Sequence, residues 1–236
     1  MLRPEDVPGA DAAFMEDEGR EEGRAWWRRR DVVTANDGGD ERRRNGSRST
    51  SEETEIMYEG LEEGLGEVAN CIRENGPIDG VVGFSQGACA AAMVGSLLEE
   101  GRMEAFEQLE KRDGIPYPQS FAQLQQAPLK FVVSYCGFRA PGARYQAFYD
   151  PGIKTPVLHV LGQLDTVVDE GRSRALVEVC EGGSERVLMH PGGHFVPSQK
   201  VWLEGVVRFM RECVEGGEKG GEGKEEEKVE DMDVPF

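Results

Sequence analysis

Four short apolar segments, separated by segments with helical spacing, most strongly constrain the fold of this chain. They span residues 78–84, 129–135, 156–162 and 186–189. Each is nearly continuous in apolar residues rather than alternating, which is typical of strands buried on both faces of a parallel sheet. Amphipathic helices between such strands cover the two faces. The sequence therefore predicts an α/β fold with a mostly parallel sheet and helices on both faces.

The intervening helices are predicted from apolar residues three or four positions apart. Asn75-Gly76 supplies a stop signal for the first helix, and Ser198 can cap the last. Residues 102–128 are polar and interrupted by prolines, so we expect them to leave the sheet as an excursion. The predicted helices are residues 55–75, 88–100, 169–181 and 198–213.

Both ends of the chain lack the pattern of a packed domain. Residues 1–54 show no sustained period and are predicted to be irregular, with a disordered loop at about 34–53. The pair Trp26-Trp27 is the exception, because two large aromatic side chains should anchor this segment on the domain. Residues 215–236 hold nine acids and three lysines and are predicted to be a disordered tail. An α/β core at 55–214 remains.

The charge of the chain excludes several classes of partner. Asp and Glu number 45 against 27 Lys and Arg, which gives a net charge of −18 and a pI of about 4.6. Nucleic acid and anionic membrane surfaces would be repelled. Two arginine triplets, Arg28–Arg30 and Arg42–Arg44, could form a nuclear-import or acidic-partner patch, but interspersed acids favour a solvated loop.

The cysteines and the first residues indicate the compartment. Five cysteines are scattered without a C-x-x-C pair, which favours reduced intracellular thiols. The first residues lack the apolar core of a signal peptide, and no apolar run approaches the ~18 residues that span a bilayer. We expect a cytoplasmic protein, with the nucleus as the alternative if the arginine triplets act as an import signal.

The motif Gly83-Phe84-Ser85-Gln86-Gly87 follows a predicted strand and precedes a predicted helix. A G-x-S-x-G motif in this position is typical of a nucleophile elbow, whose sharp turn requires small neighbours and projects the serine oxygen from the sheet. The N–H of Gln86, at the helix start, could then stabilise an oxyanion. The alternative is a tight strand-to-helix turn without chemistry, and the context favours Ser85 as a nucleophile.

A serine nucleophile needs a base and an orienting acid, in the chain order Ser, Asp or Glu, His in this kind of fold. Of three histidines, His159 lies inside a predicted strand, and His190 ends a strand. His194 is preferred because two glycines before it let its loop curl back toward the elbow. Asp165 follows the strand at 156–162 and is the candidate acid, whereas Asp169 more simply begins the next helix.

Other chemistries have weaker support. Cys89 lies one helical turn after the serine and is interpreted as core packing, while Cys136 at a strand end could line a pocket. The histidines are not paired with other ligands at metal-binding spacing, and no phosphate-binding glycine motif is present. We therefore expect no metal and no cofactor.

Four stretches of the chain resemble a known family. They are the Arg24–Trp27 segment, the Gly76–Ala88 segment around the serine, the Thr155–Asp165 segment and the His190–Pro197 segment. Together they resemble the FSH serine hydrolases, a branch of the α/β-hydrolases that includes the ovarian-tumour-suppressor-candidate-like hydrolases and fungal polyketide-releasing thioesterases. The resemblance implies Ser85 as nucleophile, Asp165 as acid and His194 as base.

One feature of the family has no counterpart in this sequence. Family members begin with a strand and a His-Gly loop whose backbone supplies a second oxyanion donor. No His-Gly pair occurs in this sequence, so we expect a sheet that is short of strands and an oxyanion hole with one donor. Loss of one such donor costs on the order of 10² to 10³ in kcat.

These observations favour a serine hydrolase that cleaves small carboxylic esters or thioesters through an acyl-enzyme. Two alternatives are a weak or inactive remnant that binds a ligand, and an interaction protein that uses the basic loop and acidic tail. The aromatic residues of 138–153 either receive an acyl chain or pack in the core, and the sequence favours neither.

Overall fold

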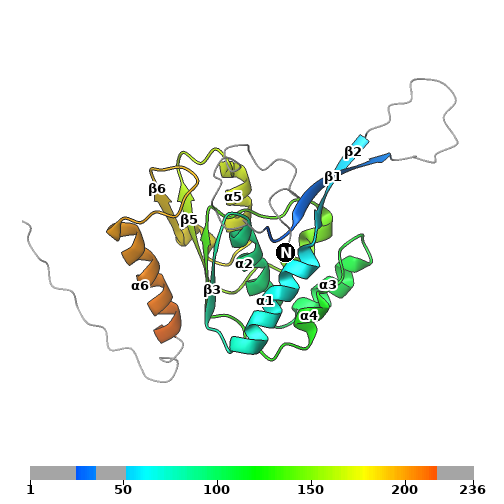
Figure 1. Cartoon of the computed structure of the whole chain (residues 1–236), viewed down its shortest axis with the longest axis horizontal. Helices are drawn as coiled ribbons and strands as arrows, with labels where there is room; N and C mark the ends of the chain where they lie inside the picture. Colours follow the sequence, from blue (N-terminus) through cyan, green and yellow to red (C-terminus); the bar gives the residue numbers. More distant parts are fainter. Residues whose placement is uncertain (1–24, 36–51, 217–236) are drawn as a thin grey trace, which may run out of the picture.

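A parallel sheet of four strands, in the order β3-β4-β5-β6, forms the centre of the computed structural model, which describes residues 25–35 and 52–216 (Figure 1). All three neighbouring pairs are parallel, as the continuous apolar segments predicted. The strand bounds agree with the prediction to within a few residues. The strands are β3 Gly80–Phe84, β4 Phe131–Tyr135, β5 Val157–Gly162 and β6 Val187–His190.

Helices cover both faces of this sheet. α1, α2 and α5 lie on one face, and α6 is the one helix of the described residues on the other (Figure 1). α6 packs Val206 and Phe209 against β4 and β5, which makes a small second core. The predicted α/β fold with helices on both faces is therefore confirmed. The helices are α1 Leu61–Asn75, α2 Gln86–Leu97, α5 Glu170–Glu178 and α6 Lys200–Gly216.

The excursion predicted at 102–128 is helical in part. It contains α3, Arg102–Glu110, and the short α4, Gln119–Ala122. Phe106 of α3 is fully buried against Phe148, with ring centroids 4.9 Å apart. The polar composition of α3 hid this helix, because one aromatic residue and a buried arginine, Arg102, carry most of its packing.

The prediction of an irregular segment at residues 1–54 is wrong where the structure describes that segment. Strands β1, Arg28–Ala35, and β2, Glu52–Glu59, form an antiparallel hairpin. The first helix consequently begins at Leu61 and not at Glu55, after Gly60 with a positive φ of 83°. Charged residues dominate both strands, so the alternation that marks a half-buried strand is missing.

The hairpin is held to the domain by an aromatic stack. Trp27 is buried, as expected, and its ring stacks on Tyr58 with centroids 4.8 Å apart. Tyr58 stacks in turn on Tyr145, and the Tyr58 N–H donates a hydrogen bond of 2.6 Å to the Tyr145 hydroxyl. Residues 36–51 of the loop predicted at about 34–53, and residues 217–236 of the tail predicted at 215–236, lie outside the described residues. The first two residues of the predicted tail belong to α6.

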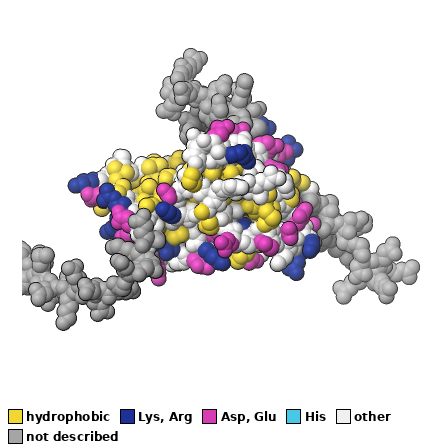
Figure 2. Space-filling model, turned by 90° about the horizontal axis from the view of Figure 1, so that it is seen from below, with side chains coloured by type: hydrophobic (Ala, Val, Ile, Leu, Met, Phe, Trp, Pro, Cys, Tyr) yellow, Lys and Arg dark blue, Asp and Glu magenta, His cyan; other side chains and the backbone are white. Residues whose placement is uncertain are grey.

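The surface mixes charged and apolar side chains. α6 leaves Val201, Leu203 and Val207 exposed, and apolar side chains are visible among charged ones at that end of the molecule (Figure 2). Among the helices that the structure describes, none combines the length and hydropathy needed to cross a membrane.

Candidate active site

Ser85 lies at the sharp turn between β3 and α2. Its backbone has φ 54° and ψ −119°, a strained conformation for a residue with a side chain. The turn brings Gly83 so close to Gly87 that a Cβ on Gly83 would overlap the Gly87 carbonyl. The Ser85 N–H donates a 2.8 Å hydrogen bond to the Tyr135 carbonyl of β4. The two glycines of the motif therefore permit the turn that presents the serine oxygen at the carboxyl edge of the sheet.

A continuous chain of hydrogen bonds joins three of the predicted site residues. His194 Nε2 lies 2.9 Å from Ser85 Oγ, and His194 Nδ1 lies 2.8 Å from Asp165 Oδ2. Asp165 comes from the turn after β5 and His194 from the loop after β6, so three separate loops meet at one point. The sequence-predicted serine, histidine and aspartate are brought together by the structure.

Backbone contacts lock the two loops that carry the acid and the histidine. The Leu164 N–H donates to the Gly192 carbonyl at 3.0 Å. A Cβ on Gly162 would overlap the Gly193 carbonyl, so the end of β5 must lack a side chain for the loop before His194 to approach. This explains physically why β5 ends in a glycine.

The surroundings of Asp165 favour its ionised form. Burial acts to raise the pKa of this carboxyl, but the hydrogen bond from His194 and the N–H groups of Val168 and Val167 outweigh burial, so the pKa is lowered. Both N–H donors lie 2.9 Å from Oδ1. Because an ionised carboxylate only accepts hydrogen bonds, the proton must be on His194 Nδ1. Nε2 is then an acceptor for the Ser85 hydroxyl, which is the arrangement of a general base.

Gln86 contributes both its main chain and its side chain to the elbow, and only the main-chain N–H was singled out by the sequence. It is the first residue of α2, so its N–H has no acceptor within the helix and faces the anion-favouring end of the helix dipole. Its side chain accepts a 2.8 Å hydrogen bond from the Trp26 N–H and donates one of 3.0 Å to the Trp27 carbonyl. This clamp joins the elbow to the N-terminal hairpin, across about 60 residues of sequence, and no local pattern indicates it.

The rejected candidates lie elsewhere. His159 is buried in β5, and His190 ends β6, where its Nδ1 accepts a 3.2 Å hydrogen bond from the Gly192 N–H. Asp169 caps α5 by accepting a 3.0 Å hydrogen bond from the Arg172 N–H. Cys89 is fully buried in the core, and burial raises the pKa of its thiol to about 12. Each has the structural role that the sequence suggested.

Cys136, which the sequence placed at a strand end where it could line a pocket, is a neighbour of the site. It has a positive φ of 50°, and its thiol points to the Phe195 carbonyl at 3.8 Å. Burial and the Asp165 carboxylate raise its pKa to about 11. Its sulfur, an Asp165 oxygen and a His194 nitrogen lie within 4.8 Å of one another. These are potential metal ligands, but the aspartate and histidine already bond each other, and a thiol with a raised pKa is a poor ligand.

The aromatic residues of 138–153 pack in the core. Phe138, Tyr145, Phe148 and Tyr149 are each less than a tenth exposed. The Tyr149 hydroxyl accepts a 3.0 Å hydrogen bond from the Ala140 N–H. Of the two interpretations, packing is therefore the one that the structure supports.

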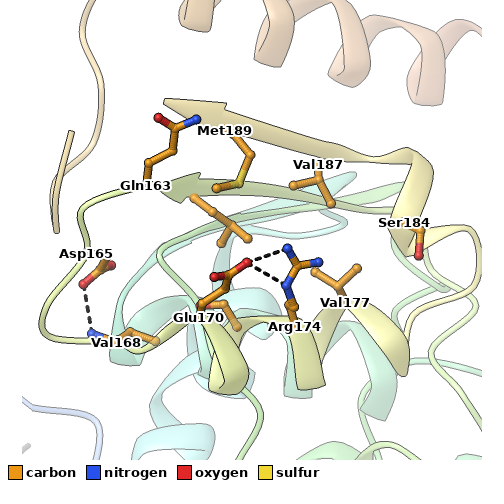
Figure 3. A pocket seen from close by; sticks show the side chains of 12 residues that line it. Gln163, Asp165, Val168, Glu170, Arg174, Val177, Ser184, Val187 and Met189 are labelled. Atoms are coloured by element: carbon orange, nitrogen blue, oxygen red, sulfur yellow. Dashed lines mark hydrogen bonds and ion pairs between the residues drawn. The ribbon is translucent and has the colours of Figure 1, made fainter. Parts of the chain in front are cut away.

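A cavity of about 430 Å³ lies beside Asp165, between α5 and the last two strands (Figure 3). Figure 3 shows Asp165 at one end of it and the Glu170–Arg174 ion pair within it. Neither Ser85 nor His194 lines this cavity. It lies behind the acid loop, so it does not place a ligand against the serine.

The fold and the hydrogen-bonded serine, histidine and aspartate define the class as α/β-hydrolase-like. A family profile described as "Serine hydrolase (FSH1)" matches residues 1–206, so the chain belongs to this serine hydrolase family. This confirms the resemblance drawn from the sequence.

Three curated relatives illustrate the similarity. The chain is 39% identical to a dihydrofolate reductase of Schizosaccharomyces pombe over 67% of its own length and 31% of that protein. It is 37% identical to Family of serine hydrolases 3 of Saccharomyces cerevisiae over 60% of its length and 47% of that protein. It is 30% identical to Esterase OVCA2 of Xenopus tropicalis over 86% of its length and 76% of that protein. The chain thus spans less than half the length of the first two.

Proposed function

We propose that this protein is a serine hydrolase that cleaves a carboxylic ester or thioester through an acyl-enzyme. The observation that carries the proposal is the unbroken hydrogen-bond chain Ser85–His194–Asp165. Membership of a serine hydrolase family supports it. The relatives named as esterases point to the same kind of bond.

In the first half of the proposed reaction, Ser85 Oγ attacks the substrate carbonyl carbon and its proton passes to His194 Nε2. Asp165 stabilises the imidazolium that forms, and the Gln86 N–H donates to the oxyanion. His194 then gives its proton to the departing alkoxide or thiolate, which leaves the acyl group on Ser85. In the second half, His194 takes a proton from water, the hydroxide adds to the acyl carbon, and the proton returns to Ser85 as the acid is released.

The apolar side chains around the site support an acyl group of apolar character. Phe84 precedes the serine, and its ring centroid lies 4.9 Å from that of His194. Leu164 and Val167 in the acid loop and Phe195 and Val196 after the histidine are all exposed. Exposed apolar residues clustered at one site are typical of a binding surface.

A fluorophosphonate probe tests the nucleophile directly. Wild-type protein should be labelled covalently, and Ser85→Ala should lose labelling completely. The matched control is Ser198→Ala, an exposed serine in the loop after His194, which should label as wild type does. Equal labelling of wild type and Ser85→Ala would overturn the assignment. Matched ester and thioester substrates of increasing acyl length would then define the preferred bond and chain.

A second candidate function is ligand or partner binding without turnover. The observation that favours it is the exposure of β3, the strand that leads to the serine, where Val82 is 58% exposed. Edge strands of this kind can pair with another segment. Single-turnover kinetics separates the two functions, because a binding protein should form no acyl-enzyme with an activated ester, whereas the hydrolase should show a burst of product.

A further inference from the structure

A second cavity, open to solvent and about 610 Å³ in volume, is lined by three arginines. It lies between the N-terminal hairpin, the loop after β4 and the first turn of α5. The arginines are Arg29 of β1, Arg139 of the loop and Arg172 of α5. We call it the arginine cavity. Its lining is unexpected in a chain with a net charge of −18.

Aromatic rings hold two of these guanidinium groups. Arg172 lies over the ring of Phe138, with Cζ 4.1 Å from the centroid, and Arg139 lies over Tyr149 at 5.2 Å. A guanidinium stacked on an aromatic ring is fixed in plane and keeps N–H donors at its edge for a second partner. The two side chains are thus positioned in advance of any ligand.

Neither stacked arginine forms an ion pair within the part of the chain that the structure describes. Across residues 25–35 and 52–216, no carboxylate forms an ion pair with Arg139 or Arg172. The Arg139 Nε is buried and has no hydrogen-bond partner there. A buried polar atom without a partner is uncommon in folded proteins and points to a missing acceptor.

The acids near the cavity are already engaged. Asp169 lines it, but its carboxylate caps α5 by accepting a hydrogen bond from the main-chain N–H of Arg172. Asp31 pairs with Arg29 at 3.0 Å on the surface. Three guanidinium groups against these two carboxylates leave a positive excess, and the amino end of α5 adds to it.

The arginine cavity lies at the same edge of the sheet as Ser85. Arg29 follows closely after Trp26, whose indole nitrogen would lie 3.2 Å from a Cβ placed on Gly87 of the elbow. Phe138, whose ring contacts the Arg172 guanidinium, is two residues after Cys136 in the sequence. Cys136 in turn lies beside Asp165 and His194. The chain segments that contact the site therefore continue, within a few residues, into residues that line the arginine cavity.

We propose that the arginine cavity binds an anionic group of the substrate, a phosphate or carboxylate carried at a distance from the scissile carbonyl. This inference rests on the proposed hydrolase function for its catalytic meaning. Arginine is the side chain best suited to bidentate recognition of both anions. The substrate class is then an ester or thioester with an acidic group on the part remote from the reacting carbonyl.

Direct binding tests the cavity without any turnover. Pyrophosphate and citrate are titrated separately into Ser85→Ala protein, with calorimetry as the readout, to distinguish phosphate from carboxylate. The double variant Arg139→Gln/Arg172→Gln, made in the same background, should bind the preferred anion at least about tenfold more weakly. The control Arg174→Gln removes an exposed charge from the same helix and should change affinity less than about twofold. No binding of either anion, or equal loss in the control, would overturn the proposal.

Kinetics tests whether the bound anion belongs to the substrate. The substrates are two thioesters with one acyl group, the first on a phosphorylated thiol and the second on a neutral thiol of similar length. Made in protein that retains Ser85, the Arg139→Gln/Arg172→Gln double variant should raise KM for the phosphorylated substrate about tenfold and leave the neutral one unchanged. If citrate binds more tightly than pyrophosphate, the two substrates are instead an ester that carries a carboxylate on its remote part and a neutral ester of similar length. Equal loss for both substrates would contradict a substrate subsite, whereas absence of all turnover with anion binding intact would refute only the hydrolase function.

Discussion

Strands β3 and β4 are neighbours in one sheet but differ sharply in how they are covered. All five residues of β4 are buried, whereas β3 leaves Val82 58% exposed and Phe84 40% exposed. Val82 and Val133 are register partners on one face, yet only Val133 belongs to the small core beneath α6. The strand that presents the serine is therefore the less covered of the two. Burial of that strand cannot be what aligns the site.

Close backbone contacts at the end of β3 provide the alignment instead. The approach of Gly83 to Gly87, the hydrogen bond from Ser85 to β4 and the Gln86 clamp all act within a few residues of the serine. The buried strands therefore contribute to the unfolding free energy, whereas the end of the exposed strand β3 sets the position of Ser85. The two contributions should be separable by mutation.

The largest effect is expected for Gly83→Ala. The new Cβ would overlap the Gly87 carbonyl, so the elbow must open and Ser85 must move away from His194. A displacement of about 1 Å costs about 10²-fold, and loss of the aligned Gln86 N–H adds to it, so we expect kcat/KM to fall by about 10³-fold or more. Fluorophosphonate labelling rates and ester hydrolysis measure the change.

The control for this substitution is Gly66→Ala on α1, where a Cβ would meet nothing within 4 Å. It should raise the unfolding free energy by about 0.5 to 1 kcal/mol and leave activity unchanged. If Gly83→Ala retained wild-type labelling, backbone contact would not be what sets the elbow.

This division also explains what the sequence could predict. The glycines around Ser85 have a local steric cause, so a short motif was enough to find the serine. The chain order Ser, Asp, His and the positions of Asp165 and His194 after predicted strands then indicated the acid and the base. The hairpin, the Gln86 clamp and the position of Cys136 depend on contacts between residues about 30 to 90 positions apart. Such contacts leave no periodic signal. The charged hairpin strands went unpredicted for the same reason, because Trp27 and Tyr58 hold them by stacking.

The next largest effect is expected for the stability of the protein at acidic pH, which depends on His159, a residue buried in β5. Burial, with a smaller contribution from Arg186, lowers its pKa from 6.5 to about 4. Below pH 6.5 the unfolded chain takes up a proton that the folded protein refuses until about pH 4, so folding stability is lost across this window as pH falls. The loss is about 3 kcal/mol at most. His159→Leu should remove this slope from urea unfolding free energies measured between pH 7 and 4.

His194→Gln is the matched comparison for that measurement, since it alters a partly exposed histidine at the site edge. It should keep the His159 slope while abolishing labelling of Ser85. An unchanged slope in His159→Leu would mean that this histidine is protonated in the folded protein. Asp165, whose pKa is lowered, affects stability only at more acidic pH, because its contribution is present above the unfolded pKa and lost below it.

The register partners Val133 and Val82 test the comparison between strands most directly. Val133→Ala creates a cavity under α6 and should cost about 2 kcal/mol of unfolding free energy, measured by urea denaturation. Val82→Ala should cost less than about 0.5 kcal/mol because its side chain is already largely in water. Neither should change the labelling rate of Ser85. Equal costs would show that β3 is covered in solution by something that the described residues do not include.

An effect smaller than that of Val133→Ala is expected for Gln86→Ala, which keeps the backbone N–H of the elbow and removes only the clamp. The Trp26 N–H and Trp27 carbonyl would turn to water, so unfolding free energy should fall by about 1 kcal/mol. Gln86→Glu retains an acceptor for Trp26 but not a donor for Trp27, and should lose about half as much. Activity should fall less than about tenfold in both variants, because the proposed oxyanion donor is a main-chain N–H that both variants keep. A loss as large as that of Gly83→Ala would mean that the hairpin, held through this clamp, itself positions the serine.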